Sequence, residues 1–214
     1  MSQKLPSHSQ SPLNQEEQAL LAIGEQVLSE AKNLGASGAD ISLNQVDGLS
    51  YTVRNGEPET VEKNKDKGLN IRVFFGDQTG SASTTDYSES ALKASVEAAM
   101  AIAKVTQGDP CLRLTTGDLF PKQWIDLDQL HPQAWTGEQA AQAALDYALR
   151  CEQAALEVDA RISNTEGATF NAHVGTTLMM SSEGFCGFSR GSRYGLSASV
   201  IAGEKDKMQR DYWY

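Results

Sequence analysis

The chain has 214 residues and a formal net charge of −10 at pH 7. A globular chain of this length buries about 70% of the surface that it exposes when unfolded, so the size of the core is not a limit. Direct nucleic-acid binding needs a concentrated basic surface, whereas the 18 Lys and Arg residues are scattered along the sequence. The composition therefore argues against a nucleic-acid partner.

The sequence carries no evident membrane, export or disulfide signal. The longest purely apolar run, residues 98–103, is too short to span a membrane, and the amino terminus lacks the apolar centre of a signal peptide. Cys111, Cys151 and Cys186 are far apart and form no C-x-x-C pair, so neither a disulfide framework nor a thiolate zinc site is predicted. We expect a soluble cytoplasmic protein whose cysteines are small buried residues in a reducing compartment.

The first structured element is predicted to be a helix that follows a disordered leader. Residues 1–13 are rich in Ser, Gln and Pro and have no apolar period, which is typical of disorder. Asn14 and Glu17 have the spacing of a capping box, and Gly35 offers a stop. Between them, apolar residues repeat at spacings of three and four: Leu20, Ile23, Val27, Ala31 and Leu34.

Residues 39–85 are predicted to form a meander of short antiparallel strands. The expected strands lie near residues 41–43, 49–53, 57–63, 68–75 and 78–85. Asn55-Gly56 and Gly76-Asp77 are two-residue hairpin signals, so the strands that they join are antiparallel. Pro58 cannot donate a ladder hydrogen bond, so its strand is expected to lie at an edge or to start after Pro58, and the polar residues 64–67 indicate a bend.

The strand at residues 68–75 organises this meander, because its residues alternate between two faces. Leu69, Ile71, Val73 and Phe75 are predicted to face the core, and Asn70, Arg72 and Phe74 to face away. The returning strand carries almost no side chain from Gly80 to Ser83, which indicates that a helix lies close against it. The alternative is a ligand-cradling loop, although phosphate loops have more glycines at fixed offsets and a lysine.

The helix that packs there is predicted over residues 88–105. Asp86 and Glu89 have capping-box spacing. The apolar stripe consists of Leu92, Val96, Ala99 and Ala103. A long connection follows over residues 107–135, which in a compact domain indicates a wrapping or functional loop. In this connection Asp126, Asp128 and His131 are interpreted as a solvated acidic loop; a metal cluster is the alternative, although metal sites bring three or four ligands to one point.

The last part of the chain is predicted to be a helix followed by strands. Thr136 and Gln139 have capping-box spacing. A stripe of small residues follows at Ala141, Ala144, Ala148, Cys151, Ala155 and Val158. From Arg161 onward the period changes to two, most clearly in Tyr194, Leu196, Ala198, Val200 and Ala202. Turn residues at 182–184 and 203–204 separate the strands, and a second antiparallel sheet is expected.

These elements predict an α+β fold in which antiparallel sheets pack with helices. The expected order is helix, β-meander, helix, long loop, helix, second β-meander. The expected domain organisation is a leader at residues 1–13, an α+β domain at 14–106 and a connecting loop at 107–135. Residues 136–214 are expected to form a helix and antiparallel strands that begin a larger domain.

The residues alone assign no catalytic, cofactor-binding or metal-binding position. Gly187 to Gly191 fit the G-x-S-x-G pattern of a serine hydrolase centred on Ser189. The hydrolase elbow needs a helix after the serine and a histidine later in the chain, whereas a strand is predicted to follow and no histidine lies beyond His173. The context therefore argues against a hydrolase.

The histidines and one arginine-containing group are two further candidates for a binding site. The three histidines, His8, His131 and His173, have no second histidine or thiolate at ligand spacing, so they are interpreted as loop or strand residues. Arg190, Arg193 and Tyr194 could form a small anion site. Arginines that flank glycines in a strand-rich region are more often solvated.

Five short phrases occur along the chain in a fixed order. They are NGE at 55–57, GSASTTD at 80–86, DPC at 109–111, NTEGATFN at 164–171 and QRDYWY at 209–214. In this order and spacing they resemble the amino-terminal part of the TldD/PmbA family, specifically its PmbA branch, which is also called TldE. The resemblance runs from about residue 15 to the last residue.

The resemblance implies a cytoplasmic two-subunit metalloprotease that degrades or trims peptides, in a family also labelled modulator of DNA gyrase. In that family a His-Glu-x-x-x-His helix and a later cysteine of the TldD subunit bind zinc, and PmbA subunits lack these ligands. This sequence has no such motif, because its histidines are followed by Ser, Pro and Val. Family members are longer than this chain, and its aromatic end at residues 212–214 suggests a fragment that lacks the carboxy-terminal half.

We therefore expect the amino-terminal part of a PmbA-like subunit that is non-catalytic by itself and holds no cofactor. It would act with a zinc-bearing TldD-like partner on peptide or unfolded protein substrates. The alternative is a stand-alone binding or scaffold module without enzymatic activity, and a serine hydrolase that acts through Ser189 is a third hypothesis. An unpaired strand edge and aromatic surface at residues 212–214 also predict self-association.

Overall fold

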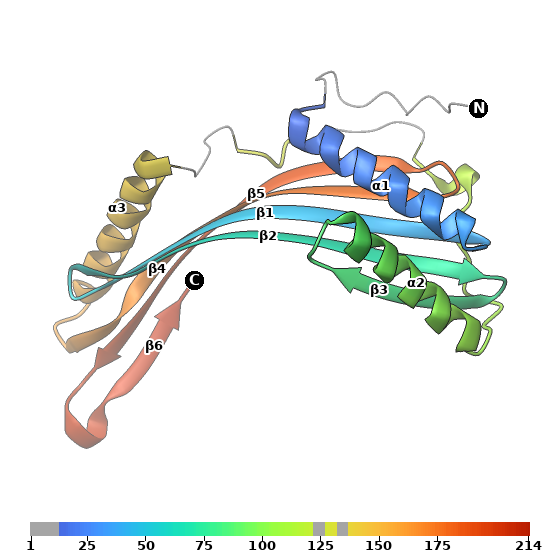
Figure 1. Ribbon diagram of the computed structural model, residues 1–214. Helices are drawn as coiled ribbons and strands as arrows, with labels where there is room; N and C mark the ends of the chain where they lie inside the picture. The colour runs from blue at the N-terminus through green and yellow to red at the C-terminus, as the bar shows by residue number, and fades with distance from the viewer. Residues whose placement is uncertain (1–12, 122–126, 132–136) are drawn as a thin grey trace. The chain divides into compact units, whose positions relative to one another are not determined.

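The computed structural model describes residues 13–121, 127–131 and 137–214. Within them lie three α-helices: α1 (Gln15–Asn33), α2 (Glu89–Val105) and α3 (Gly137–Leu156). Six strands accompany them: β1 (Gly38–Arg54), β2 (Glu57–Phe75), β3 (Gln78–Thr84), β4 (Ile162–Ser181), β5 (Cys186–Ala202) and β6 (Gln209–Trp213). Two 3-10 turns, Gly117–Leu119 and Lys205–Lys207, complete the elements. The strands form one sheet in the order β3-β2-β1-β4-β5-β6 (Figure 1). The predicted α+β fold is confirmed.

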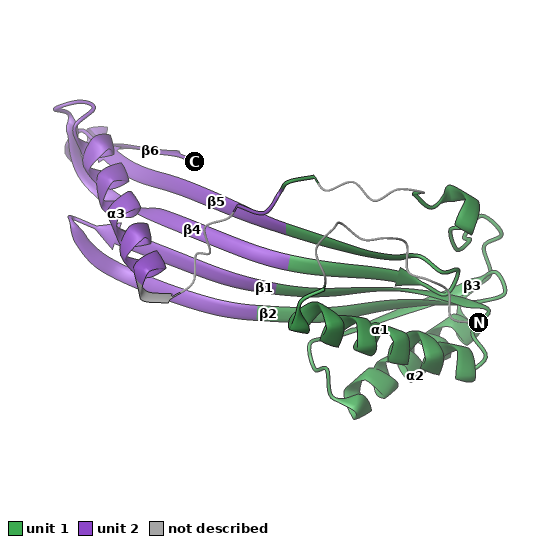
Figure 2. Ribbon diagram, turned by 90° about the horizontal axis from the view of Figure 1, so that it is seen from above, with its two compact units in different colours: residues 1–45, 66–128, 176–190 green, residues 46–65, 129–175, 191–214 purple. Residues whose placement is uncertain are grey.

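The chain divides into two compact units, and segments of the two units alternate along the sequence (Figure 2). Unit 1 comprises residues 1–45, 66–128 and 176–190, and unit 2 comprises residues 46–65, 129–175 and 191–214. The long strands β1, β2, β4 and β5 each give residues to both units. The contiguous domains proposed from the sequence stay a prediction, and nearly all of the predicted leader lies outside the described residues.

The core of unit 1 lies between one face of its strands and the helices α1 and α2, which pack side by side on that face (Figure 1). The strands contribute Ile41, Leu43, Leu69, Ile71 and Val73 to this core, each 3% exposed or less. The stripe predicted for the second helix is buried in full, because Leu92, Val96, Ala99 and Ala103 all lie in the same cluster. Alternation along the strands leaves the intervening side chains on the opposite face.

Helix α2 lies close against β3 at Gly80. A β-carbon built on Gly80 would meet the carbonyl oxygen of Ala99 and come within 2.5 Å of the Ala103 nitrogen. Both neighbours are backbone atoms of a helix, so they cannot move aside as the end of a side chain can. The expectation that a helix lies against this thin strand is confirmed, and the ligand-cradling alternative is wrong for Gly80.

We predict that Gly80→Ala destabilises the chain by about 1–3 kcal/mol, because the added methyl group forces α2 away from the sheet. Urea unfolding followed by circular dichroism measures the change. Ser81→Ala is the matched control, since Ser81 is the next residue on β3 and is exposed; it should change stability by less than about 0.5 kcal/mol. Equal losses in both variants would contradict the close-packing account.

The amino terminus of α1 is held by a buried carboxylate. Asn14 and Glu17 form the predicted capping box, in which the Glu17 nitrogen donates to Asn14 Oδ1 at 2.9 Å and Glu17 Oε2 accepts from the Asn14 nitrogen at 2.9 Å. Glu17 is fully buried and also accepts two hydrogen bonds from the Arg190 guanidinium of β5. A charge removed from water in this way needs its partner.

We predict that Arg190→Met destabilises the chain by about 3–5 kcal/mol, because it leaves the buried Glu17 carboxylate without its cation. Arg193→Met is the matched control, since Arg193 is exposed on the same strand and its loss should be small. The double variant Glu17→Gln/Arg190→Met should recover part of the stability, because the uncompensated charge is gone. Urea denaturation of the four proteins tests this; equal effects of the two single variants would exclude the buried pair as the cause.

The core of unit 2 is smaller and packs α3 against β1 and β4. Its buried members are Leu49, Val53, Ala140, Ala144, Ala148, Ala168, Phe170 and Ala172. Small residues on α3 let the helix approach its strands. Glu152 of the same helix is 2% exposed and accepts from the backbone nitrogens of Asn55 at 2.9 Å and Gly56 at 2.8 Å. Asn55 and Gly56 have φ angles of 54° and 76°, which confirms the predicted hairpin turn.

Several predicted elements differ from the structure. Residues 38–54 form one continuous strand rather than two, and residues 57–75 continue through the predicted bend at 64–67. Residues 57–67 are exposed on both faces, so they lack the alternation that marks a strand. The predicted second sheet is wrong as well, because β4, β5 and β6 continue the same sheet.

Local details also need correction. Helix α2 is capped by Ser88 rather than Asp86, since the Ser88 hydroxyl accepts from the Ala91 nitrogen at 3.4 Å. Phe75 is 39% exposed at the end of its strand, whereas Phe74 is buried. The predicted stripe of α3 runs past the end of the helix, because Val158 lies beyond Leu156 and is 78% exposed. The predicted cap at Thr136 lies outside the described residues.

Candidate functional site

The face of unit 1 opposite the helices carries a groove of about 720 Å³. Its floor consists of side chains that alternate with the core residues, namely Asp40, Ser42, Asn70, Arg72, Ser81, Ser83, Met179 and Ser181. Its apolar wall includes Leu114, Leu119, Phe120 and Phe185. Four strands therefore supply a mostly polar floor, and the segment after α2 supplies most of an apolar wall.

One ion pair crosses the floor of the groove. Arg72 Nε donates to both carboxylate oxygens of Asp40, at 3.3 and 3.2 Å, and Arg72 Nη2 donates to Asp40 Oδ2. The Arg72 guanidinium also lies 5.2 Å from the centre of the Phe74 ring. Both charged side chains are partly exposed, so the pair adds little to stability. Its effect is to leave the floor with no net charge.

The strand register places small polar side chains beside this pair. Arg72 is opposite Ser81, and Asn70 is opposite Ser83, in the antiparallel pairing of β2 with β3. Serine hydroxyls and the asparagine amide each donate and accept hydrogen bonds. The floor therefore presents both kinds of hydrogen-bonding group over neighbouring strands.

The wall segment is fixed to unit 1 at three places. The Asp109 nitrogen donates to the Asp77 carbonyl oxygen at 2.9 Å, next to the β2–β3 turn. Leu114 packs on Gly38, where a β-carbon would lie 2.8 Å from the leucine side chain. The Phe120 and Phe185 rings pack against each other with centres 5.1 Å apart and planes tilted by 42°. These contacts hold the described part of the wall over the sheet.

The residues considered for an anion site have other partners or positions. Arg190 is bound to Glu17 in unit 1, so its guanidinium is engaged in holding α1. Arg193 is exposed, and Tyr194 meets the His131 ring edge-on at 5.6 Å. The G-x-S-x-G sequence lies wholly within β5, so Ser189 is on a strand rather than on a strand-to-helix elbow. The arrangement of a serine hydrolase is therefore not formed.

The candidate metal loop is only partly described, because Asp126 lies outside the described residues. Across residues 13–121, 127–131 and 137–214, no three His, Cys, Asp or Glu side chains gather where one ion could bind. His173 lies on β4, as the sequence predicts.

The three cysteines differ in their surroundings. Burial, with a further contribution from the Glu25 charge, raises the pKa of Cys186 to about 11. Burial and the neighbouring Glu152 also raise the pKa of Cys151. Both thiols are therefore protonated and weakly nucleophilic at neutral pH. Cys111 is exposed, so the prediction that all three cysteines are buried is wrong.

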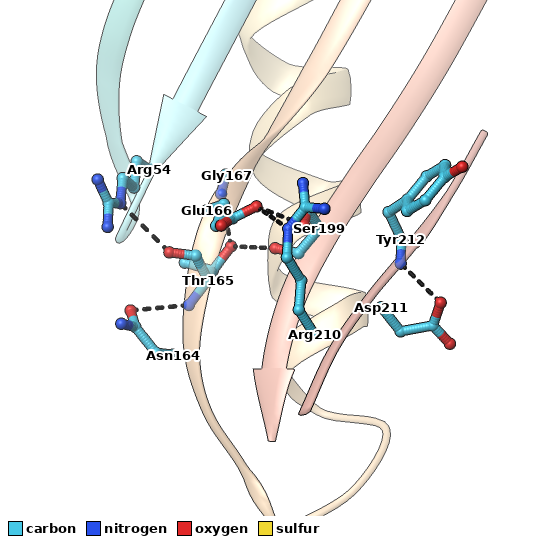
Figure 3. A network of polar contacts seen from close by, with 9 residues as sticks. All are labelled: Arg54, Asn164, Thr165, Glu166, Gly167, Ser199, Arg210, Asp211 and Tyr212. Carbon is cyan, nitrogen blue, oxygen red and sulfur yellow. Dashed lines mark hydrogen bonds and ion pairs between the residues drawn. The ribbon is translucent and has the colours of Figure 1, made fainter. Parts of the chain in front are cut away.

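Unit 2 contains a polar network that ties its last three strands together (Figure 3). Glu166 of β4 accepts from the Ser199 hydroxyl at 2.9 Å and from Arg210 Nε of β6. The Thr165 hydroxyl donates to the Ser199 carbonyl oxygen at 3.1 Å and accepts from the Gly167 nitrogen at 2.8 Å. Hydrogen bonds from Arg210 and Ser199 lower the pKa of Glu166. The network supports β6, whose five residues are all exposed.

We predict that Glu166→Gln weakens the attachment of β6 at neutral pH. Because the folded-state pKa of Glu166 is lowered, its contribution is present above the unfolded pKa and is lost as pH falls through the folded pKa. Hydrogen exchange of the β6 amides, compared between wild type and variant at equal pH, should differ at pH 7 and converge in acid. Glu157→Gln, at an exposed glutamate just after α3, is the control; a pH-independent difference would contradict the ionic account.

The sequence indicated the chemistry of the groove floor but not the groove. Alternation on β2 correctly placed Asn70 and Arg72 away from the core. The wall was missed because residues 112–121 have no apolar period and their contacts are made with residues far away in the sequence. The aromatic residues Phe120 and Phe185 were the available signal, since each stands in a turn-rich segment with little other apolar material.

Two models of known protein families match consecutive segments of the chain. Residues 39–103 match the family model for PmbA/TldA metallopeptidase domain 1, and residues 136–214 match the model for the PmbA/TldA metallopeptidase central domain. The chain belongs to the PmbA/TldD family. The resemblance inferred from the five sequence phrases is thereby confirmed, and the chain is a PmbA/TldE-like member.

Two proteins named for PmbA show how far the similarity extends. The Metalloprotease PmbA homolog of Haemophilus influenzae is 42% identical over 204 residues, which cover 92% of this chain and 44% of the relative. Metalloprotease PmbA of Escherichia coli O157:H7 is 39% identical over 193 residues, covering 89% of this chain and 42% of the relative. The chain thus spans less than half the length of these relatives.

Solved structures show the same fold. A Bacteroides thetaiotaomicron protein described as a candidate modulator of DNA gyrase superposes with a TM-score of 0.81 at 19% identity, covering 94% of this chain and 45% of that one. TldE from Thermococcus kodakarensis superposes with a TM-score of 0.70 at 13% identity, covering 89% of this chain and 42% of that one. Among the described residues, no helix is long and apolar enough to cross a membrane.

Proposed function

We propose that this chain is the amino-terminal part of a PmbA/TldE-like subunit that works with a TldD-like partner in processing peptides. The observation that supports this most strongly is the match of two PmbA/TldA metallopeptidase domains in order, together with 39–42% identity to proteins named Metalloprotease PmbA. The fold shared with a TldE protein agrees with this proposal.

In this proposal the chain is a non-catalytic subunit, and zinc is supplied by the partner. Zinc in a peptidase lowers the pKa of a bound water and polarises the scissile carbonyl. The 214 residues contain no His-Glu pair, and the described residues do not bring three zinc ligands together, so they do not fit this group. No hydrolytic step is therefore assigned to a residue of this chain.

The role left to the chain is to bind and position. The groove of unit 1 offers paired hydrogen-bonding groups on its floor and apolar side chains on its wall, which is the combination found in ligand pockets. A subunit that holds part of a peptide restricts its orientation before the partner cleaves it. Less orientational freedom is then lost at the cleavage step. The stand-alone binding module remains the second candidate, because the same groove would serve it.

We predict that the full-length protein, tagged at its chromosomal locus, co-purifies with a protein that contains a His-Glu-x-x-x-His motif. Mass spectrometry identifies the partner, and elemental analysis should give zinc near one equivalent per complex. The 214-residue chain, purified without an affinity tag, should carry less than about one-tenth of an equivalent of zinc and show no peptidase activity, because its described His, Cys, Asp and Glu side chains do not gather at one point.

A matched experiment separates the two candidates. Substituting the first histidine of the partner's motif should abolish peptide cleavage by the complex and leave co-purification intact. Repeated recovery of the full-length protein without such a partner would favour the stand-alone module. Stoichiometric zinc in this chain, lost together with peptide cleavage on chelation, would contradict the assignment to a non-catalytic subunit.

A further inference from the structure

The floor of the groove in unit 1 carries both hydrogen-bond donors and acceptors, as a surface that binds a peptide backbone requires. A peptide bond offers one donor and one acceptor, and it carries no charge. Ser81 and Ser83 stand beside Arg72 and Asn70 on adjacent strands, so donors and acceptors repeat along the floor. An extended chain laid over them can form hydrogen bonds whatever its sequence.

The charges around the groove favour an uncharged occupant. Among the described residues that line it, Asp40 and Arg72 are the only charged side chains, and they bind each other. A charged ligand side chain that enters such a site loses water and finds no unpaired counter-charge, which is costly. An acidic side chain would in addition meet Asp40 and a chain whose net charge is −10.

The wall favours one apolar side chain. Leu119 is 72% exposed and Met179 is 54% exposed, although both line the groove. Leucine with this exposure leaves apolar surface in water, and methionine adapts its shape to different partners. An aromatic or branched aliphatic side chain that packed between Leu119 and Met179 would remove this surface from water.

The size of the groove favours a short segment over a folded partner. A stable protein interface buries about 800 Å² on each side and is commonly flat, whereas pockets of about 300–1,000 Å³ hold small ligands. The groove, at about 720 Å³, falls in the second class. The wall segment is already anchored by Leu114 and Phe120, so the site is formed before a ligand arrives.

We infer that this groove binds an uncharged, extended segment of a peptide substrate, with one apolar side chain held between Leu119 and Met179. The inference rests on the proposed function, because it gives the substrate of the subunit a place and a chemical class. The segment lies across β2 and β3, where Asn70, Ser81 and Ser83 form hydrogen bonds with its backbone.

A titration monitored by two-dimensional amide NMR tests the inference on the 214-residue chain. The probe is the blocked peptide acetyl-Gly-Ser-Phe-Ser-Gly-amide, and the control probe has Asp in place of Phe. The expected result is a set of shifts centred on residues 70–72, 81–83 and 119–120. The Phe peptide should bind about tenfold more tightly than the Asp peptide, a difference of about 1.4 kcal/mol.

Two variants show whether the shifts come from the groove. Ser83→Trp fills the floor and should weaken binding of the Phe peptide by about tenfold or more. Ala94→Trp adds the same bulk at an exposed position of α2, outside the groove, and should bind as wild type does. Circular dichroism confirms that both variants are folded.

The titration and the two variants can support or overturn peptide binding in the groove. Shifts that cluster elsewhere, unchanged binding by Ser83→Trp, no binding at all, or equal binding of the Asp peptide would overturn it. Recovery of a TldD-like partner alongside a groove that does not bind would leave the proposed function standing and remove the inference. Peptide binding in the groove without recovery of a TldD-like partner would support the inference and contradict the assignment to a two-subunit complex.

Discussion

The contact between α2 and β3 at Gly80 decides how unit 1 is organised. A helix that touches the strand backbone through Ala99 and Ala103 leaves no room for side chains between them, so this face of the sheet must be core. An antiparallel sheet needs only one buried face. The other face therefore keeps its polar side chains, and the segment after α2 can fold back over them to form a groove with Phe120 in its wall.

The parts of the fold that could be predicted are those set by short-range chemistry. The turn at Asn55-Gly56 requires two positive φ angles, and the cap at Asn14 requires an acceptor for the first helical nitrogens, so each leaves a local signature. The long strands could not be divided correctly in the same way. Over residues 57–67 neither face is buried, so the pattern that identifies a strand is absent although the backbone stays extended.

The burial of two carboxylates, Glu17 and Glu152, could not be predicted from neighbouring residues in the sequence. Glu17 and Glu152 look like ordinary surface residues of amphipathic helices, and a glutamate on a helix is usually solvated. Each is buried because its partners come from distant parts of the chain: Arg190 for Glu17, and the backbone nitrogens of the β1–β2 turn for Glu152. A sequence pattern can show that a cap is present, but the tertiary fold decides whether the capping side chain also carries a buried ion pair.

The candidate site follows the same division between near and distant contacts. Alternation on β2 places Asn70 and Arg72 on the face away from the core, and this part could be read from the sequence. The ion pair with Asp40 and the wall at Leu119 depend on strand order and on a segment without periodicity. In the peptide complex that we propose, the floor would bond to groups present in every peptide, and the apolar wall would discriminate among ligands through a single side chain. Such weak selectivity agrees with the proposed role, in which this subunit holds peptides of varied sequence and a partner cleaves them.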